Sequence, residues 1–157
     1  MIRLEPRPQA SAFWSYGSPV LALLTKGFCV LEPNQAAVLS LLSREVYSIE
    51  IVEPLARRAT SDLSRLGYGN VRVRHGDGYR GWPDAAPFDA IIVTCAPDHV
   101  PQALVDQLKD GGRMVIPVGE ADSQELFLLR KRGNQLQRDA VLPVRFVPMT
   151  GAADARP

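Results

Sequence analysis

Residues able to carry chemistry lie at the carboxyl ends of four predicted strands. They are Glu32, Glu50, the Gly76–Asp77–Gly78 triplet and the segment from Thr94 to Pro97. In a doubly wound parallel sheet, ligands bind outside the carboxyl ends of the strands, near the point where the strand order reverses. Carboxylates at that edge can accept hydrogen bonds from a ribose diol or from the exocyclic amine of a base. The sequence therefore predicts a ligand site built from these segments.

Glu50 ends the strand predicted over 46–50. Its carboxylate could accept two hydrogen bonds from a ribose, and its charge would attract a cationic ligand. Two structural alternatives stay open, namely a solvated loop acid and an ion-pair partner for Arg44. The neighbouring Glu53 is expected to begin a helix, where the helix dipole favours an acid.

Asp77 lies between two glycines after the strand predicted over 71–75. Glycines allow tight backbone geometry close to a planar ring, so Asp77 could accept from an exocyclic amine while the Gly78 N–H donates to a ring nitrogen. The alternative is a simple β-turn, because Asp-Gly is a common turn pair.

The elements that must position these residues alternate between strand and helix. An apolar run, Val20 to Thr25, predicts one or two helical turns. Further strands and helices are then expected in the order strand 28–32, helix 35–43, strand 46–50, helix 54–66, strand 71–75, strand 88–94, helix 100–108 and strand 113–117. Segments 125–131 and 136–147 flank Arg132-Gly133-Asn134 and predict an antiparallel hairpin. This order predicts an α/β fold with a Rossmann-like, doubly wound, mostly parallel sheet and a C-terminal antiparallel hairpin.

Local signals set the expected helix boundaries. Asn34 is a plausible N-cap for the first main helix. Pro54 suits the first position of the second, and Gly67 ends it. One face of that second helix is expected to be lined by Leu55, Ala59, Leu63 and Leu66.

Length and composition fit one domain over 1–157, with an irregular segment at 1–19 and a disordered tail at 152–157. The formal net charge of +1 argues against nucleic acid as a partner and against an anionic membrane. No apolar run is long enough for a transmembrane helix, and no signal peptide is visible, so a cytoplasmic location is expected. Cys29 and Cys95 are expected to be reduced thiols. His75 and His99 lack metal-ligand spacing, so no metal is predicted.

Several segments together resemble the protein-L-isoaspartate O-methyltransferase family, a group of class I S-adenosylmethionine-dependent enzymes. The resemblance extends from Gln35 to Gly151. The segments that carry it are Arg44 to Glu50, Leu66 to Val71, Gly76 to Pro83, Phe88 to Thr94, Gly111 to Gly119 and Val144 to Gly151. Val144 to Gly151 is the most specific, because generic methyltransferases lack it.

The resemblance implies an activity and a set of roles. The family transfers a methyl group from S-adenosylmethionine to the carboxylate of L-isoaspartyl residues in damaged proteins, which is a repair reaction. By resemblance, Glu50 holds the ribose, Asp77 and Gly78 hold the adenine, and Thr150 reaches the cofactor side of the pocket. Isoaspartyl-containing peptides and proteins would be the partners.

Two departures from the family pattern bear on activity. Only Pro33 and Asn34 separate Val30-Leu31-Glu32 from Gln35, where the family has a glycine-rich cofactor loop, and Pro33 has no N–H to offer. The family's N-terminal region is shortened, and Ser18, followed by Pro19, is the best candidate for its catalytic serine. Two other functions therefore stay open: a non-catalytic family member that acts as a binding module, and another nucleotide-binding Rossmann-type protein.

Overall fold

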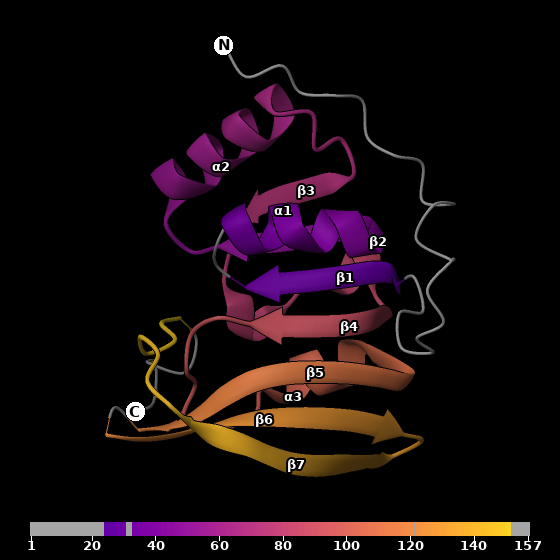
Figure 1. Cartoon of the computed structure of the whole chain (residues 1–157), viewed down its shortest axis with the longest axis vertical. Helices are drawn as coiled ribbons and strands as arrows, with labels where there is room; N and C mark the ends of the chain where they lie inside the picture. Colours follow the sequence, from indigo (N-terminus) through magenta and orange to yellow (C-terminus); the bar gives the residue numbers. More distant parts are fainter. Residues whose placement is uncertain (1–23, 31–32, 121, 152–157) are drawn as a thin grey trace, which may run out of the picture.

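A seven-stranded sheet forms the centre of the molecule, as a computed structural model shows (Figure 1). The structure describes residues 24–30, 33–120 and 122–151. The strand order is β3-β2-β1-β4-β5-β6-β7, so the order reverses beside β1. The expectations for segment 1–19, the tail 152–157, Ser18 and Glu32 lie outside the described residues.

The strands confirm the predicted fold class. Their bounds are β1 Leu24–Val30, β2 Ser43–Glu50, β3 Val71–His75, β4 Phe88–Val93, β5 Leu108–Glu120, β6 Ser123–Arg132 and β7 Gln135–Val144. The first five strands pair in parallel, whereas β6 pairs antiparallel with both β5 and β7. The hairpin turns at Gly133, whose φ of 56° is a conformation that glycine adopts without strain.

Helices cover the two faces of the sheet unequally. Among the described residues, the α-helices are α1 Pro33–Leu42, α2 Glu53–Arg65 and α3 Gln102–Gln107, and two short 3₁₀ turns occupy Gly78–Arg80 (η2) and Pro83–Ala85 (η3). One face carries α1 and α2, which pack with Val46 and Leu63 in a small apolar cluster. The larger core lies on the other face, where Leu104 of α3 packs against Met114 and Ile116 of β5.

Two predicted boundaries near β1 are wrong. Leu24 and Thr25 belong to β1 rather than to a helical turn, because Leu24 pairs with Ser43 of β2 and pairing across the sheet overrides a weak local preference. The first main helix begins at Pro33, so Asn34 lies inside it and is not an N-cap. Proline suits a first helical position, where no N–H is required.

The later helices and β5 also differ from their predicted limits. In α2 the buried residues are Ala56, Ala59 and Leu63, whereas Leu55 and Leu66 are about half exposed. The last helix starts only at Gln102, because Pro101 disfavours helical geometry at the residue before it. Strand β5 extends beyond 113–117 at both ends, since Leu108 pairs with Phe88 and Glu120 pairs with Ser123.

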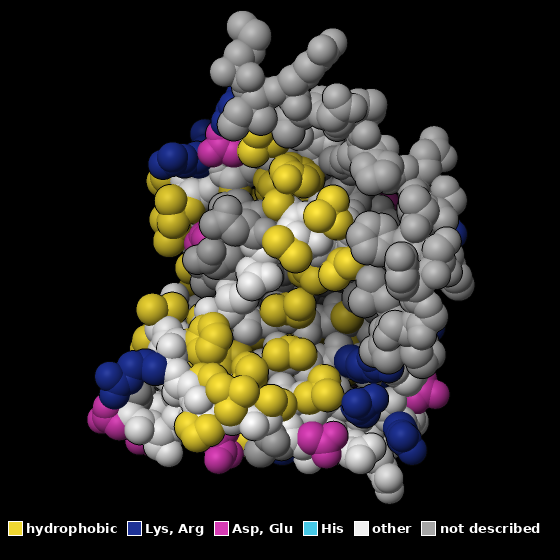
Figure 2. All heavy atoms as spheres, in the orientation of Figure 1, with side chains coloured by type: hydrophobic (Ala, Val, Ile, Leu, Met, Phe, Trp, Pro, Cys, Tyr) yellow, Lys and Arg dark blue, Asp and Glu magenta, His cyan; other side chains and the backbone are white. Residues whose placement is uncertain are grey.

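The face that carries α1 is open over the C-terminal half of the sheet. Figure 1 shows α1 in front of the sheet near β1 and β2, and no described helix lies in front of β5, β6 or β7. Figure 2 shows apolar side chains gathered on this face. The outer side of α1 is apolar as well, with Val38 and Leu41 exposed by 55% and 63%. Within the described ranges, no helix is both long and apolar enough to cross a membrane.

Candidate functional site

The carboxyl ends of β2 and β3 lie side by side. Glu50 pairs with His75 in the parallel register, and the Gly76 N–H donates to the Glu50 carbonyl oxygen at 3.0 Å. This register brings the Glu50 side chain and the Gly76–Asp77–Gly78 triplet to one edge of the sheet, as the sequence predicts. Strand β4 ends nearby and leads into Thr94 and Cys95.

Glu50 is a buried carboxylate, only 7% exposed. Its Oε1 accepts a hydrogen bond from the Val52 N–H at 2.8 Å, and it makes no ion pair with any residue that the structure describes. The solvated-acid alternative is therefore wrong, and Arg44 is exposed and is not its partner. Because a buried charge without a cation is costly, Glu50 is a strong candidate for binding a ligand.

Cys95 lies close to Glu50 at the end of β4. Its thiol is free and fully buried. Burial, with a smaller contribution from the negative charge of Glu50, raises the pKa of the Cys95 thiol to about 12. The thiol therefore stays neutral at physiological pH and is a poor nucleophile, because reactivity requires the thiolate.

Asp77 begins the short turn η2. Its Oδ1 accepts from the Tyr79 N–H at 2.9 Å, and its Oδ2 lies 3.9 Å from Nε of the exposed Arg80. The turn that the sequence offers as an alternative is therefore present. The turn does not exclude a role in ligand binding, because it holds the carboxylate at the edge of the sheet. Gly78, the next residue, is buried.

The segment from Val147 to Gly151 lies against the same edge. Ala96 donates its N–H to the Val147 carbonyl, and Met149 donates its N–H to the Ala96 carbonyl, both at 2.8 Å. The buried Tyr79 hydroxyl donates to the Met149 carbonyl at 3.3 Å. These bonds join the chain after β7 to the ends of β3 and β4. Gly151 lies against the Asp77 side chain, and the preceding residue, Thr150, is exposed.

Gln107 anchors the loop that follows Asp77. The Trp82 N–H donates to Gln107 Oε1 at 2.7 Å, and Gln107 Nε2 donates to the Arg80 carbonyl at 2.8 Å. The Trp82 ring packs edge-on against Tyr47 at 5.2 Å between centroids, beneath the Arg74 guanidinium at 4.2 Å. Trp82 therefore packs this loop against the main core.

We name this edge the β2–β4 rim: Glu50, Asp77 to Tyr79, Cys95 to Ala96, and Val147 to Gly151. Strand β1 lies between β2 and β4 in the sheet, and its carboxyl end leads into what we call the β1–α1 turn, where β1 ends at Val30 and α1 begins at Pro33. Only two residues join these elements, which leaves little chain for a glycine-rich cradle. Glu32 falls in this junction, so its role stays a prediction.

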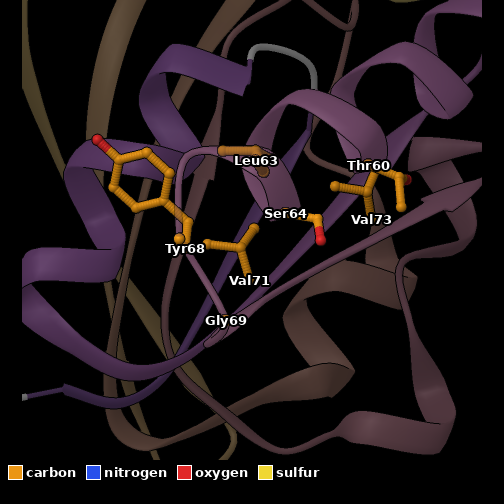
Figure 3. Close-up of a pocket in the computed structure, with 8 residues that line it drawn as sticks. Thr60, Leu63, Ser64, Tyr68, Gly69, Val71 and Val73 are labelled. Carbon is orange, nitrogen blue, oxygen red and sulfur yellow. The ribbon is translucent and has the colours of Figure 1, made fainter.

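A hollow elsewhere is unrelated to the rim. It has a volume of about 340 Å³ and lies between α2 and β3, lined by Thr60, Leu63, Ser64, Tyr68, Val71 and Val73 together with Gly67 and Gly69 (Figure 3). The segment Gly67 to Gly69 precedes β3, so this hollow includes the amino end of the strand and none of the rim residues.

The two histidines lie apart from any metal-like group. His75 Nε2 is 3.1 Å from the Ile51 carbonyl oxygen, and His99 Nδ1 pairs with the Asp98 carboxylate. Over the described part of the chain, no cluster of three or more His, Cys, Asp or Glu could hold a metal ion.

Three residues of the rim region were not singled out from the sequence. Tyr79 and Gly151 lie within two segments that resemble the family, Gly76 to Pro83 and Val144 to Gly151. The resemblance is therefore the sequence signal that could have identified them. Gln107 gave no signal, because a glutamine near the end of a short helix has no distinctive pattern.

Comparison with known proteins agrees with this architecture. Residues 32–154 match the Protein-L-isoaspartate(D-aspartate) O-methyltransferase family. The chain is 58% identical over 117 residues to the protein-L-isoaspartate O-methyltransferase of Opitutus terrae, covering 74% of this chain and 50% of that protein. It is 52% identical over 138 residues to protein-L-isoaspartate O-methyltransferase 2 of Polaromonas sp., covering 83% of this chain and 65% of the relative.

Solved structures give the same result. A protein-L-isoaspartate O-methyltransferase structure superposes with a TM-score of 0.78 at 32% identity, covering 83% of this chain and 44% of that one. A Plasmodium falciparum structure in complex with S-adenosyl-L-homocysteine shares the fold, with a TM-score of 0.66 at 23% identity over 80% of this chain and 66% of the other. The chain spans between half and two thirds of the length of these curated relatives. The chain belongs to the protein-L-isoaspartate O-methyltransferase family.

Proposed function

We propose that this chain transfers a methyl group from S-adenosylmethionine to the free carboxylate of L-isoaspartyl residues in damaged proteins. The observation that carries the proposal is the buried Glu50 carboxylate, without a cationic partner among the described residues, beside the Asp77 turn. Family membership suggests the ligand of these two carboxylates. The adenosine of the cofactor has a ribose diol, which could donate to Glu50, and an exocyclic amine, which could donate to Asp77.

The rim residues fit the adenosine part of the cofactor. Glu50 has one oxygen, Oε1, engaged by Val52, and its other oxygen makes no hydrogen bond with a described residue, so it can accept from a ribose hydroxyl. Asp77 is held at the edge by its own turn and can accept from an amine, with the buried Gly78 next to it. Thr150, exposed on the segment after β7, is proposed to lie on the cofactor side. Glu32 is proposed as a further cofactor contact.

The reaction makes modest demands on the protein. The cofactor, when bound, supplies a methyl group on a sulfonium, which is an excellent leaving group. The isoaspartyl carboxylate is already ionised at neutral pH, so no strong base is required. The protein's work is to align the two reactants and to exclude water. The neutral, buried Cys95 thiol adds no competing nucleophile. Ser18 is proposed as the catalytic serine that contacts the substrate carboxylate.

The proposed partners are isoaspartyl-containing peptides and proteins in the cytoplasm. The formal net charge of +1 supports a partner other than nucleic acid.

A non-catalytic role is the second candidate, and the β1–α1 turn is the observation that favours it. A two-residue junction offers fewer backbone N–H groups to a ligand than a glycine-rich loop does. Such a member would keep the fold and bind the cofactor weakly.

A methyl-transfer assay on paired peptides tests the proposal. Radiolabelled S-adenosylmethionine is supplied with one peptide containing L-isoaspartate and with the same peptide containing normal aspartate. We expect label only in the isoaspartyl peptide, because an extra backbone methylene shifts the carboxylate and only one position aligns for in-line attack. Equal labelling would contradict the specificity. No labelling at saturating cofactor would favour the non-catalytic role.

A further inference from the structure

The Asp77 carboxylate is packed directly against the backbone of Gly151. A Cβ added to Gly151 would lie 2.8 Å from the Asp77 carboxyl carbon and 3.1 Å from its Oδ2. Gly151 also has a φ of 138°, a backbone conformation that side chains disfavour. Only glycine therefore allows the chain to approach this carboxylate so closely.

A second contact holds the same segment in place. Tyr79, which donates its backbone N–H to Asp77, also donates its hydroxyl to the Met149 carbonyl. Tyr79 and Met149 are both buried, with exposures of 9% and 4%. One residue therefore connects the turn that presents Asp77 with the segment that packs behind Asp77.

Together these contacts confine the carboxylate on several sides. The Tyr79 N–H fixes one oxygen from within the turn, Arg80 lies 3.9 Å from the other on the solvent side, and the Gly151 backbone packs against the carboxylate, which stays 19% exposed. A carboxylate confined in this way presents its acceptor oxygens in one orientation. A site held that tightly can distinguish a ligand that donates a hydrogen bond from one that cannot.

We infer that Gly151 and Tyr79 are positioning residues that set the preference of this site for a 6-amino purine. They act by fixing the orientation of Asp77, and the chain after β7 thereby determines base specificity. This inference rests on the proposed function, because it takes the site to bind adenosine.

Binding of two nucleosides tests the inference. The probes are S-adenosylhomocysteine and S-inosylhomocysteine, which differ in having an amine or a carbonyl at the 6-position. Calorimetry on the full chain should show that the wild type prefers the adenosyl compound by tenfold or more, since a carbonyl cannot donate to Asp77. Gly151→Ala should reduce that preference to less than threefold. Tyr79→Phe should reduce it partially and should lower affinity for the adenosyl compound several-fold.

Gly133→Ala is the matched control. Gly133 also has a positive φ, 56°, but a Cβ there would meet no atom within 4 Å. This variant carries a backbone penalty without touching Asp77, and it should keep the wild-type preference. If Gly151→Ala fails to fold, Tyr79→Phe still tests the inference. This substitution removes only the hydroxyl that bonds to the Met149 carbonyl and keeps the packing of the buried ring.

A ligand-free measurement separates this inference from the proposed function. The ¹³C chemical shift of the Asp77 carboxyl should move in Gly151→Ala and stay unchanged in Gly133→Ala. Wild-type protein that binds neither compound would overturn the proposed function and the purine preference with it. Wild-type protein that binds both equally, or a Gly151→Ala variant that keeps the full preference and an unshifted Asp77 signal, would overturn the positioning role alone.

Discussion

The two parts of the proposed cofactor site are built very differently. The β2–β4 rim is held by hydrogen bonds between segments far apart in the chain, such as Tyr79 to Met149 and Met149 to Ala96. The β1–α1 turn is reduced to the two residues between Val30 and Pro33. One half of the site is therefore specified by long-range contacts, whereas the other depends on a local loop that is nearly absent.

The difference shows which part of a nucleotide site can change without loss of the fold. The rim contributes to the main core through Tyr79, Cys95 and Met149, so its disruption would also destabilise the protein. A loop at the β1–α1 turn supplies backbone donors to a ligand and contributes little to the core. Its shortening should affect affinity far more than stability.

Restoring the turn should have the largest effect. A short glycine-rich loop inserted between Glu32 and Pro33 should raise the affinity for S-adenosylhomocysteine about 100-fold, because about three new backbone hydrogen bonds contribute about 1 kcal/mol each. Calorimetry measures the change. The control is the same insertion after Gly133, in the exposed β6–β7 turn, which should leave affinity unaltered. If both insertions leave affinity unchanged, the comparison between the two parts fails.

Removing the charge at Glu50 should have the next largest effect. Glu50→Gln should weaken S-adenosylhomocysteine binding about 10- to 100-fold, since a hydrogen bond to a charged group contributes about 1.5–3 kcal/mol. The same change should raise the melting temperature of the ligand-free protein, because it removes a buried charge.

Glu53→Gln is the control for Glu50. Glu53 is exposed and pairs with Arg57 one helical turn away, at 2.7 Å, and such surface pairs contribute under about 1 kcal/mol. Its loss should leave binding and melting temperature near the wild-type values. Equal effects of the two substitutions would show that the ribose contact lies elsewhere.

The smallest expected effect is on the pH dependence of stability. It comes from the buried Cys95 thiol and tests whether water is excluded from the β2–β4 rim. Cys95 keeps its proton up to a pKa of about 12 in the folded chain, against 9.0 ordinarily. Between these values the unfolded chain loses the proton and the folded chain does not, so stability falls as the pH rises above 9. By pH 10 the loss amounts to about 1 kcal/mol.

Denaturant titrations at pH 8 and pH 10 measure this loss. Cys95→Ala should lose less stability between the two pH values than the wild type does, while the tyrosines and lysines titrate alike in both proteins. An identical pH dependence in the two proteins would mean that solvent reaches the thiol.

Sequence patterns predicted what depends on local chemistry. Strand β3 begins and ends where predicted, α2 begins at Glu53, one residue before the predicted Pro54, and Gly133 marks the hairpin turn. Errors arose where neighbours in space decide the outcome. Leu24 joins a strand because β2 lies beside it, and β5 is extended by its partners at both ends.

The site shows the same division. Glu50 and Asp77 are predicted because each lies at the carboxyl end of a predicted strand. The hydrogen bond from Tyr79 to Met149 joins residues 70 positions apart, and no local pattern encodes such a contact. The proximity of Gly151 to Asp77 likewise appears only once the chain after β7 has folded back along the end of β4.

The two edge strands of the sheet, β3 and β7, also affect whether copies of this chain can associate through strand pairing. An outer strand exposes backbone groups that can pair with another chain, and charged residues or proline suppress that pairing. Strand β3 carries Arg72 and Arg74, and β7 carries Arg138, Asp139 and Pro143. Growth of the sheet from molecule to molecule, the first step toward fibrils, is therefore opposed at both of its ends.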